Sequence, residues 1–303
     1  MFAEAVKKTM NIFLAVDGSE HSMAAIHLLS SLPITQKESP QSTVTALAVD
    51  DLRHTHHQYM LMTILEKTQE MLSAKDIQTS TGLLHGDPAS ELTRYADEHH
   101  PDLIVLGAKG LRSTLGILLG GVAQQVVEYA NCPVLVVRAP YQGLRRVALI
   151  TDGSPHSQSA CEYLGRFPWP AGVEVSVVHV LPPPPRVTAA ERYWPVLAES
   201  IPVTTTDDEA LIIAWQAEQE ENGKTLLHHT VLDLEKAGYH AKSVMLNGDA
   251  ATEIIRYLQE NQVDMFIAGS RGLNQMQAWL LGSVSRKLIH YAGCSGLLVK
   301  HKK

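Results

Sequence analysis

A glycine-rich segment near the end of the chain has the residue types that bind phosphate groups. Gly269 and Gly272 follow an apolar run, and nine residues later Gly282 and Ser283 precede a segment with helical spacing of apolar residues. Glycine lets backbone N–H groups approach an anion because no Cβ stands in the way. A helix N-terminus favours negative charge. With the hydroxyl of Ser283 and the charge of Arg271, the segment predicts a phosphate-binding loop.

An acidic residue is expected beside this loop. Asp152 follows the first apolar run of the same half of the chain, and ligands of open α/β sheets bind beyond the carboxyl ends of the strands. Its carboxylate could accept hydrogen bonds from a ribose or a base, or help to hold Mg²⁺. A purely structural role stays open, because Asp-Gly is a common turn pair.

The same arrangement occurs twice in the chain. The segment at 85–110 matches the one at 247–272 with a constant offset of 162 residues, whereas Asp17 and Asp152 correspond with an offset of 135. Self-similarity of this kind indicates a tandem duplication. A chain of 303 residues is long enough for two domains, predicted at 1–140 and 141–303.

The first copy keeps the glycines and loses two hydroxyls. Gly121 and Ala123 stand where the second copy has Ser283 and Ser285. Losing a hydrogen bond to a charged group costs about 1.5–3 kcal/mol, or roughly 10- to 100-fold in affinity. Weaker binding is therefore expected in the first half. The candidate residues of this weaker site are Asp17, Val49, Gly107, Lys109, Gly110, Gly120, Gly121 and Val122.

Five strands are predicted in each half. Runs such as FLAV and LIVL are apolar on both faces, which is typical of parallel strands covered by helices on both sides. Ser19, Ser154, Asp87 and Asp249 are the predicted helix N-caps. The predicted fold is α/β, with two tandem, open, doubly wound, Rossmann-like sheets. The predicted strands are 11–16, 43–49, 78–84, 103–107 and 134–138, then 146–151, 174–179, 240–246, 265–269 and 296–300.

The second copy holds a net 27 extra residues, which the alignment of the copies places between Pro182 and about Gly223. Four consecutive prolines at 182–185 fit neither a helix nor a central strand, so an extended start is expected. Two interpretations stay open for the stretch. It forms a lid over a site, or it forms a solvated loop with a short helix at 210–217.

The glycine pattern resembles that of the universal stress protein (UspA) family, in its ATP-binding branch. Residues 269–283 match the family signature of Gly, two residues, Gly, nine residues and Gly-Ser, and the DGS at 152–154 is similar too. The resemblance implies an ATP site, with or without Mg²⁺, in which Asp152 and Val180 border adenine and ribose. The residues implied around the phosphates are Gly269, Gly272, Gly282, Ser283 and Val284, and the spacing adds Arg271 and Ser285 as candidates.

The resemblance also implies how the halves assemble. In the family the last strands pair, so 134–138 and 296–300 are expected to join the two halves as an internal pseudo-dimer. Exposed strand edges of this kind otherwise invite aggregation. A further homodimer and the identity of a regulatory protein partner stay open.

Composition narrows the classes of function and partner. The net charge is −7, with 10 basic against 15 acidic residues up to residue 140 and 15 against 17 beyond it, so neither half favours nucleic acid or an anionic membrane. No apolar run approaches 18 residues, and Cys132, Cys161 and Cys294 show no CxxC spacing. A soluble, cytoplasmic protein is expected.

Catalytic motifs are not evident in the sequence, which holds neither GxSxG nor HExxH. His54, His56 and His57 lie close together in a loop-like stretch that favours a surface cluster, and His179 ends a strand where it could border a ligand. The sequence therefore favours a nucleotide-responsive stress regulator over an enzyme. A nucleotide-free interaction scaffold and a slow ATPase are the alternatives.

Overall fold

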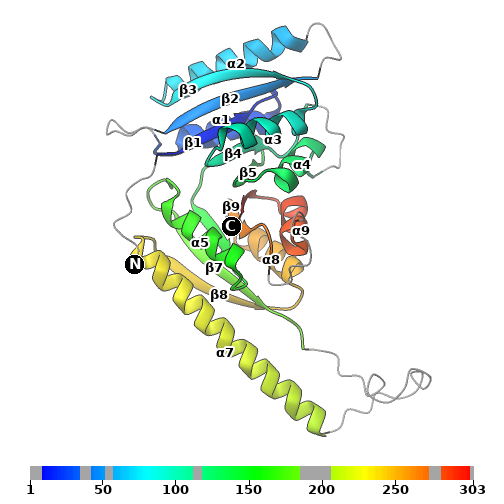
Figure 1. Cartoon of the computed structure of the whole chain (residues 1–303). Coiled ribbons are helices and arrows are strands. Elements are labelled where there is room, and N and C mark those ends of the chain that lie inside the picture. The colour runs from blue at the N-terminus through cyan, green and yellow to red at the C-terminus, as the bar shows by residue number, and fades with distance from the viewer. Residues whose placement is uncertain are drawn as a thin grey trace, which may run out of the picture.

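Strands and helices alternate along both halves of the chain (Figure 1). The computed structural model describes residues 9–34, 42–51, 57–111, 118–184, 206–272 and 281–300. The first half contains β1 (Asn11–Ala15), α1 (Glu20–Ser31), β2 (Thr43–Asp50), α2 (His57–Ser73), β3 (Gln78–His85), α3 (Pro88–His99), β4 (Leu103–Gly107), α4 (Gly121–Tyr129) and β5 (Val134–Val137). The second half contains β6 (Arg146–Ile150), α5 (Pro155–Arg166), β7 (Glu174–Leu181), α7 (Thr206–Lys236), β8 (Ala241–Asn247), α8 (Ala250–Glu260), β9 (Met265–Gly269), α9 (Ser283–Tyr291) and β10 (Ser295–Val299). All ten predicted strands are confirmed.

The strand order within each half is that of an open doubly wound sheet. The described strands form one sheet in the order β3-β2-β1-β4-β5-β10-β9-β6-β7-β8. All neighbours within a half are parallel, and the first strand lies beside the fourth, with Phe13 paired to Ile104 and Ala148 to Phe266. The strand order reverses at these two places, where open α/β sheets have their ligand crevice at the carboxyl edge. The predicted fold class is confirmed.

The two halves meet at β5 and β10, the last strand of each half. These strands are antiparallel, with Leu135 opposite Leu297. Both strands are therefore inner strands of a continuous sheet, with no exposed edge at the joint. The expected division at residue 140 falls in the connection between β5 and β6.

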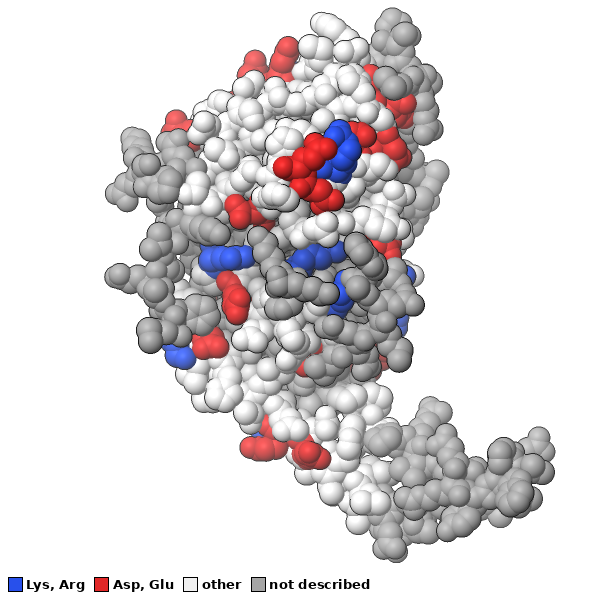
Figure 2. Space-filling model, in the orientation of Figure 1, with Lys and Arg blue, Asp and Glu red and all other residues white. Residues whose placement is uncertain are grey.

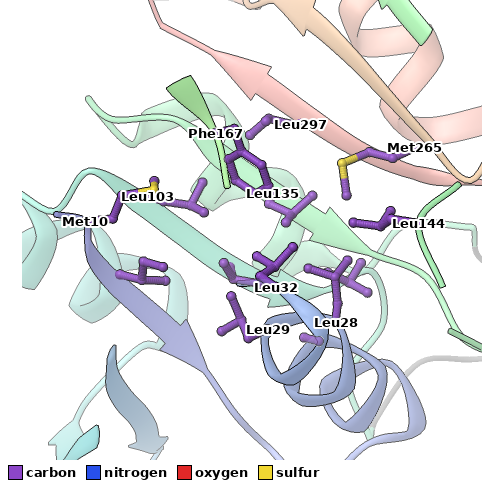
Figure 3. Packing of buried hydrophobic residues seen from close by; sticks show 14 of the residues in the cluster. Met10, Leu28, Leu29, Leu32, Leu103, Leu135, Leu144, Phe167, Met265 and Leu297 are labelled. Carbon is purple, nitrogen blue, oxygen red and sulfur yellow. The ribbon is translucent and has the colours of Figure 1, made fainter. Parts of the chain in front are cut away.

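A hydrophobic core on one face of the sheet is shared by both halves. Leu135 and Leu297 lie beside Leu28 of α1 and Phe167, and each of the four is at most 2% exposed (Figure 3). A second core, on the other face, includes Leu288 of α9 and residues of α4. Burying a large apolar side chain contributes about 1.5–3 kcal/mol, so each half stabilises the other through these shared cores.

The predicted N-caps are confirmed. Ser19 and Ser154 accept a hydrogen bond from the backbone N–H three residues further on, at the starts of α1 and α5. Asp87 and Asp249 cap α3 and α8 in the same way. A side-chain oxygen at this position satisfies one of the four helix N–H groups that have no partner within the helix.

Part of the extra length of the second half lengthens a helix. The 31-residue α7 is the counterpart of α2, which has 17 residues. A separate short helix at 210–217 is therefore wrong, because these residues belong to α7, whose sequence contains no proline. Figure 1 shows the start of α7 extending beyond the sheet. Most of the predicted lid or loop, at 185–205, lies outside the described residues.

The surface carries charges of both signs. Acidic and basic side chains are interspersed on the face in Figure 2, with much uncharged surface between them. Among the helices that the structure describes, α7 included, none is long and apolar enough to cross a membrane.

Candidate functional site

The first glycine of each loop is required by helix packing. A Cβ on Gly107 would lie 2.7 Å from the backbone nitrogen of Ser22 in α1, and a Cβ on Gly269 would lie 2.6 Å from the backbone carbon of His156 in α5. Real Cβ atoms do not make such short contacts with backbone. These glycines let the first helix of each half approach the end of the fourth strand, so their packing role is independent of any ligand.

The second glycine of each loop contacts a carboxylate. A Cβ on Gly110 would lie 2.6 Å from Oδ2 of Asp17, and a Cβ on Gly272 would lie 2.6 Å from Oδ2 of Asp152. The other oxygen, Oδ1, accepts from the backbone N–H two residues further on, at 2.9 Å in the first half and 3.0 Å in the second. The Leu111 N–H donates to Oδ2 of Asp17 at 3.2 Å. Each carboxylate thus joins the end of the first strand to the glycine loop.

The helices that follow the loops begin without a side-chain cap. Gly120 and Gly282 are the N-caps of α4 and α9, and neither helix start has a side-chain hydrogen bond. The Gly120 N–H donates to Ala108 O at 2.8 Å, and the Gly282 N–H to Ser270 O at 2.9 Å. The next N–H groups have no acceptor in their own helix, which makes this end of the helix suited to an anion.

A cavity of about 330 Å³ lies at the carboxyl edge of the first half. All eight candidate residues of the first half line it, from the ends of β1, β2 and β4 to the start of α4. The remaining lining residues are Ala15, Val16, Leu47, Asp51, Leu61, Pro88, Leu92, Leu106, Ala108, Leu111 and Ala123. The structure therefore brings the sequence candidates of this half together in one mostly apolar cavity.

Three serines distinguish the loop of the second half from that of the first. Ser283 is the exposed first residue of α9, whereas the Ser285 hydroxyl is buried and donates to Gly269 O at 2.7 Å. Ser285 therefore links α9 to β9, which differs from its expected place around a phosphate. Ser270 is also buried, with its hydroxyl 3.4 Å from Nδ1 of His156. The position of Gly121, which corresponds to Ser283, has open space where a Cβ would stand.

The two loop cations lie in different surroundings. Lys109 lines the cavity of the first half, and with burial it lowers the pKa of His21. Arg271 is half-buried, and its charge adds to the effect of burial in lowering the pKa of Lys300 to about 8. Both cations are positioned to add positive charge near their loop.

His179 packs within the fold. Its Nδ1 lies 2.9 Å from Thr151 O, and a Cβ on Gly223 of α7 would lie 3.1 Å from its ring. The repeat places Gly223 where the first half has Leu61, so the smaller residue makes room for the imidazole. The expected cluster at His54 and His56 lies outside the described residues.

Cys132 and Cys294 pack within the fold. Cys132 is 7% exposed, and burial raises the pKa of the Cys294 thiol to about 12. A thiol with so high a pKa is a poor nucleophile at neutral pH.

His21 belongs to none of the sequence motifs. Its Nδ1 accepts from the Ala139 N–H at 2.9 Å, which ties α1 to the end of β5. His156 stands at the same place in the second copy, at the offset of Asp17 and Asp152. A histidine repeated at matching positions was the signal that could have revealed it.

These features define a class of protein, a tandem open α/β fold with a glycine loop at the carboxyl edge of each half. The chain belongs to the universal stress protein family, whose model matches residues 8–138 and 143–300. It is 31% identical over 155 residues to universal stress protein YxiE of Bacillus subtilis, covering 51% of this chain and 98% of that protein. It is 41% identical over 160 residues to universal stress protein MJ0531 of Methanocaldococcus jannaschii, covering 52% of this chain and 84% of that protein.

The fold of the whole chain is similar to a solved structure. The crystal structure of a universal stress protein from Archaeoglobus fulgidus is 18% identical in sequence, with a TM-score of 0.64, and the match covers 99% of both chains. At this identity the likeness concerns the fold. The resemblance to the universal stress protein family, and the tandem arrangement, are thus confirmed.

Proposed function

We propose that this universal stress protein binds ATP in the glycine-loop clefts of its two halves and acts as a nucleotide-responsive regulator. The observation that carries the proposal is the first-half cavity, where a carboxylate, a glycine loop and an uncapped helix N-terminus converge. Its volume of about 330 Å³ falls in the range of small-molecule sites, about 300–1,000 Å³. A mostly apolar wall with a few polar groups is typical of such sites.

The lining residues include groups that suit each end of a nucleotide. Val49, Leu61 and Leu106 offer an apolar wall for the base. Asp17 at the end of β1 is available to accept from a ribose hydroxyl or the adenine amino group. The phosphates fit where Gly110 and the start of α4 supply backbone N–H groups and Lys109 supplies charge.

The second half offers the same parts with one more donor. Asp152 contacts Gly272 as Asp17 contacts Gly110, and Ser283 adds an exposed hydroxyl at the start of α9. Arg271 takes the place of Lys109. We therefore infer tighter ATP binding in the second half, by roughly 10-fold or more for the added hydrogen bond to a charged group.

Magnesium fits the proposal as a companion of the phosphates. Among the described residues no three His, Cys, Asp or Glu side chains gather into a cation site. Mg²⁺ is commonly held by phosphate oxygens, water and one or two carboxylates. Asp17 and Asp152 are the carboxylates that would supply this single protein ligand in each cleft.

The proposed output is a change at the mouth of the cleft. Leu111 and Val122 line the cavity and are 55% and 39% exposed, respectively. A nucleotide that contacts the loop and the start of α4 restricts these apolar side chains, and a partner that binds the mouth then distinguishes the two states. Such a response needs only a difference in ATP affinity between the states.

Hydrogen exchange with and without ATP tests the proposal. Millimolar ATP with Mg²⁺ should slow exchange at 107–111 and 120–124, and at 269–272 and 282–286, while leaving α7 unchanged. A regulator should not turn ATP over at an enzymatic rate, so phosphate release well below about 1 s⁻¹ is expected. Unchanged exchange at all four segments would overturn ATP binding. Phosphate release of about 1 s⁻¹ or faster would contradict the regulatory role and favour an ATPase.

A further inference from the structure

Two equivalent cations cross the joint between the halves. Arg138 directly follows β5 and Lys300 directly follows β10, at matching positions of the repeat. Nη2 of Arg138 donates to Ile289 O of α9 at 2.8 Å, and Nζ of Lys300 donates to Val127 O of α4 at 2.9 Å. Each side chain therefore binds a helix of the opposite half.

Both cations bind the carboxyl end of their helix. Arg138 also reaches His290 O at 3.3 Å, and Lys300 reaches Glu128 O at 3.2 Å. α9 ends at Tyr291 and α4 at Tyr129. The last four carbonyls of a helix have no partner within it and carry partial negative charge, so a cation here stabilises the last turn both by hydrogen bonding and by charge.

The helices held in this way are the two that form the clefts. α4 and α9 lie next to one another on the same side of the sheet (Figure 1), in the same hydrophobic core. Their opposite ends, at Gly121 and Ser283, follow the glycine loops. Arg138 also donates through Nη1 to Leu118 O at 2.6 Å, two residues before the N-cap of α4.

Burial sets these contacts apart from surface ion pairs. Burial lowers the pKa of Arg138 and lowers that of Lys300 to about 8. Removing a cation from water is costly, and the hydrogen bonds to backbone carbonyls offset only part of that cost here, since both pKa values stay lowered. By contrast, Arg286, which also crosses the joint to Glu128 at 3.3 Å, is 47% exposed and is expected to contribute little.

We propose that Arg138 and Lys300 are reciprocal positioning residues, each holding from one half the helix that forms the cleft of the other half. Lys300 of the second half then controls the first-half cleft through α4, and Arg138 of the first half controls the second-half cleft through α9. The effect on ligand affinity rests on the proposed ATP binding. The effect on the helices does not.

Hydrogen exchange of three full-length variants tests the crossed pattern without any ligand. Lys300→Met should speed exchange in the last turn of α4 about 10- to 100-fold, as expected for a lost hydrogen bond to a charged group, and leave α9 unchanged. Arg138→Met should speed exchange in the last turn of α9 and leave the last turn of α4 unchanged, while its lost bond to Leu118 O affects only the segment before α4. Arg286→Met, the matched exposed contact, should change neither helix. An effect confined to each residue's own half, or equal in both helices, would overturn the proposal.

Conservative swaps and ATP titration separate positioning from general stability. Lys300→Arg and Arg138→Lys should keep the slow exchange of the unmodified protein. Each variant places at one position the cation that the repeat already has at the matching position of the other half. In calorimetry, Lys300→Met should weaken ATP at the first cleft and leave the second unchanged. If the unmodified protein binds no ATP while the crossed exchange pattern holds, the proposed function fails and the positioning roles stand. If ATP binds and both variants weaken both clefts equally, only the positioning roles fail.

Discussion

Oδ2 of Asp152 lies 2.6 Å from the point where a Cβ on Gly272 would stand, and Asp17 has the same relationship to Gly110. The second glycine of each loop therefore leaves room for a carboxylate at the end of the first strand. A ligand that contacts the loop backbone also meets this carboxylate. The pairing explains how two segments far apart in the sequence form a single cleft.

Gly272→Ala should weaken ATP at the second cleft with little effect on stability. The added methyl displaces a carboxylate at the end of a flexible side chain, so the fold can adjust. If the displaced Asp152 carboxylate loses one hydrogen bond to ATP, the affinity for ATP should fall about 10- to 100-fold. Titration calorimetry measures this change. Gly293→Ala, where a Cβ would meet open space, is the control. Equal affinity of Gly272→Ala and the unmodified protein would refute the role of Asp152.

Gly121→Ser should strengthen ATP binding at the first cleft. No atom lies within 4 Å of the position of a Cβ on Gly121, so the serine fits without strain and restores the hydroxyl that Ser283 supplies in the second half. The expected gain is about 10-fold. Ser283→Gly is the mirror variant and should lose a similar factor. No gain in Gly121→Ser and no loss in Ser283→Gly would mean that this hydroxyl does not contact the phosphates.

Ser285→Ala should reduce stability and leave ATP affinity unchanged. The buried hydroxyl donates to Gly269 O, and losing such a bond costs about 1–2 kcal/mol of unfolding free energy. Ser283→Ala should show the opposite pattern, because its hydroxyl is exposed. Denaturant unfolding and calorimetry on both variants check the pair. A loss of affinity in Ser285→Ala without a loss of stability would return this residue to the binding site.

Most of the fold was predictable because the strands are short apolar runs with clear helix starts after them. The Ser19 and Ser154 caps and the ten strands follow from local sequence. The length of α7 was not predictable, since Asn222-Gly223 is typical of a turn, whereas in the fold Gly223 lies within α7 and packs against Leu181 and His179.

The site was predictable as a set of residues but not in its details. The spacing of the glycines identifies the loops, and all eight first-half candidates line one cavity. The direction of the Ser285 hydroxyl depends on where α9 crosses β9, which is a tertiary property. The crossed contacts of Arg138 and Lys300 likewise depend on the pairing of β5 with β10.

Lys300 should make stability depend on pH above 8. Burial lowers its pKa in the folded state to about 8, whereas an unfolded lysine has a pKa of about 10.4. Between these values the unfolded state binds more protons, so the unfolding free energy rises with pH, by up to about 1.4 kcal/mol per unit. Below pH 8 the contribution is constant. The measurement is the difference in unfolding free energy between the unmodified protein and Lys300→Met from pH 7 to 10. A flat difference would contradict a buried, titrating amine.

The most direct test of ATP binding is to count the nucleotides on each chain. Native mass spectrometry of the purified protein, followed by titration calorimetry with ATP and Mg²⁺, gives both the number and the affinities. We predict two ATP molecules per chain, with the tighter one weakened in Ser283→Ala and the weaker one strengthened in Gly121→Ser. A single ATP unaffected by either variant, or no binding at millimolar ATP, would contradict the proposal and favour a nucleotide-free interaction scaffold.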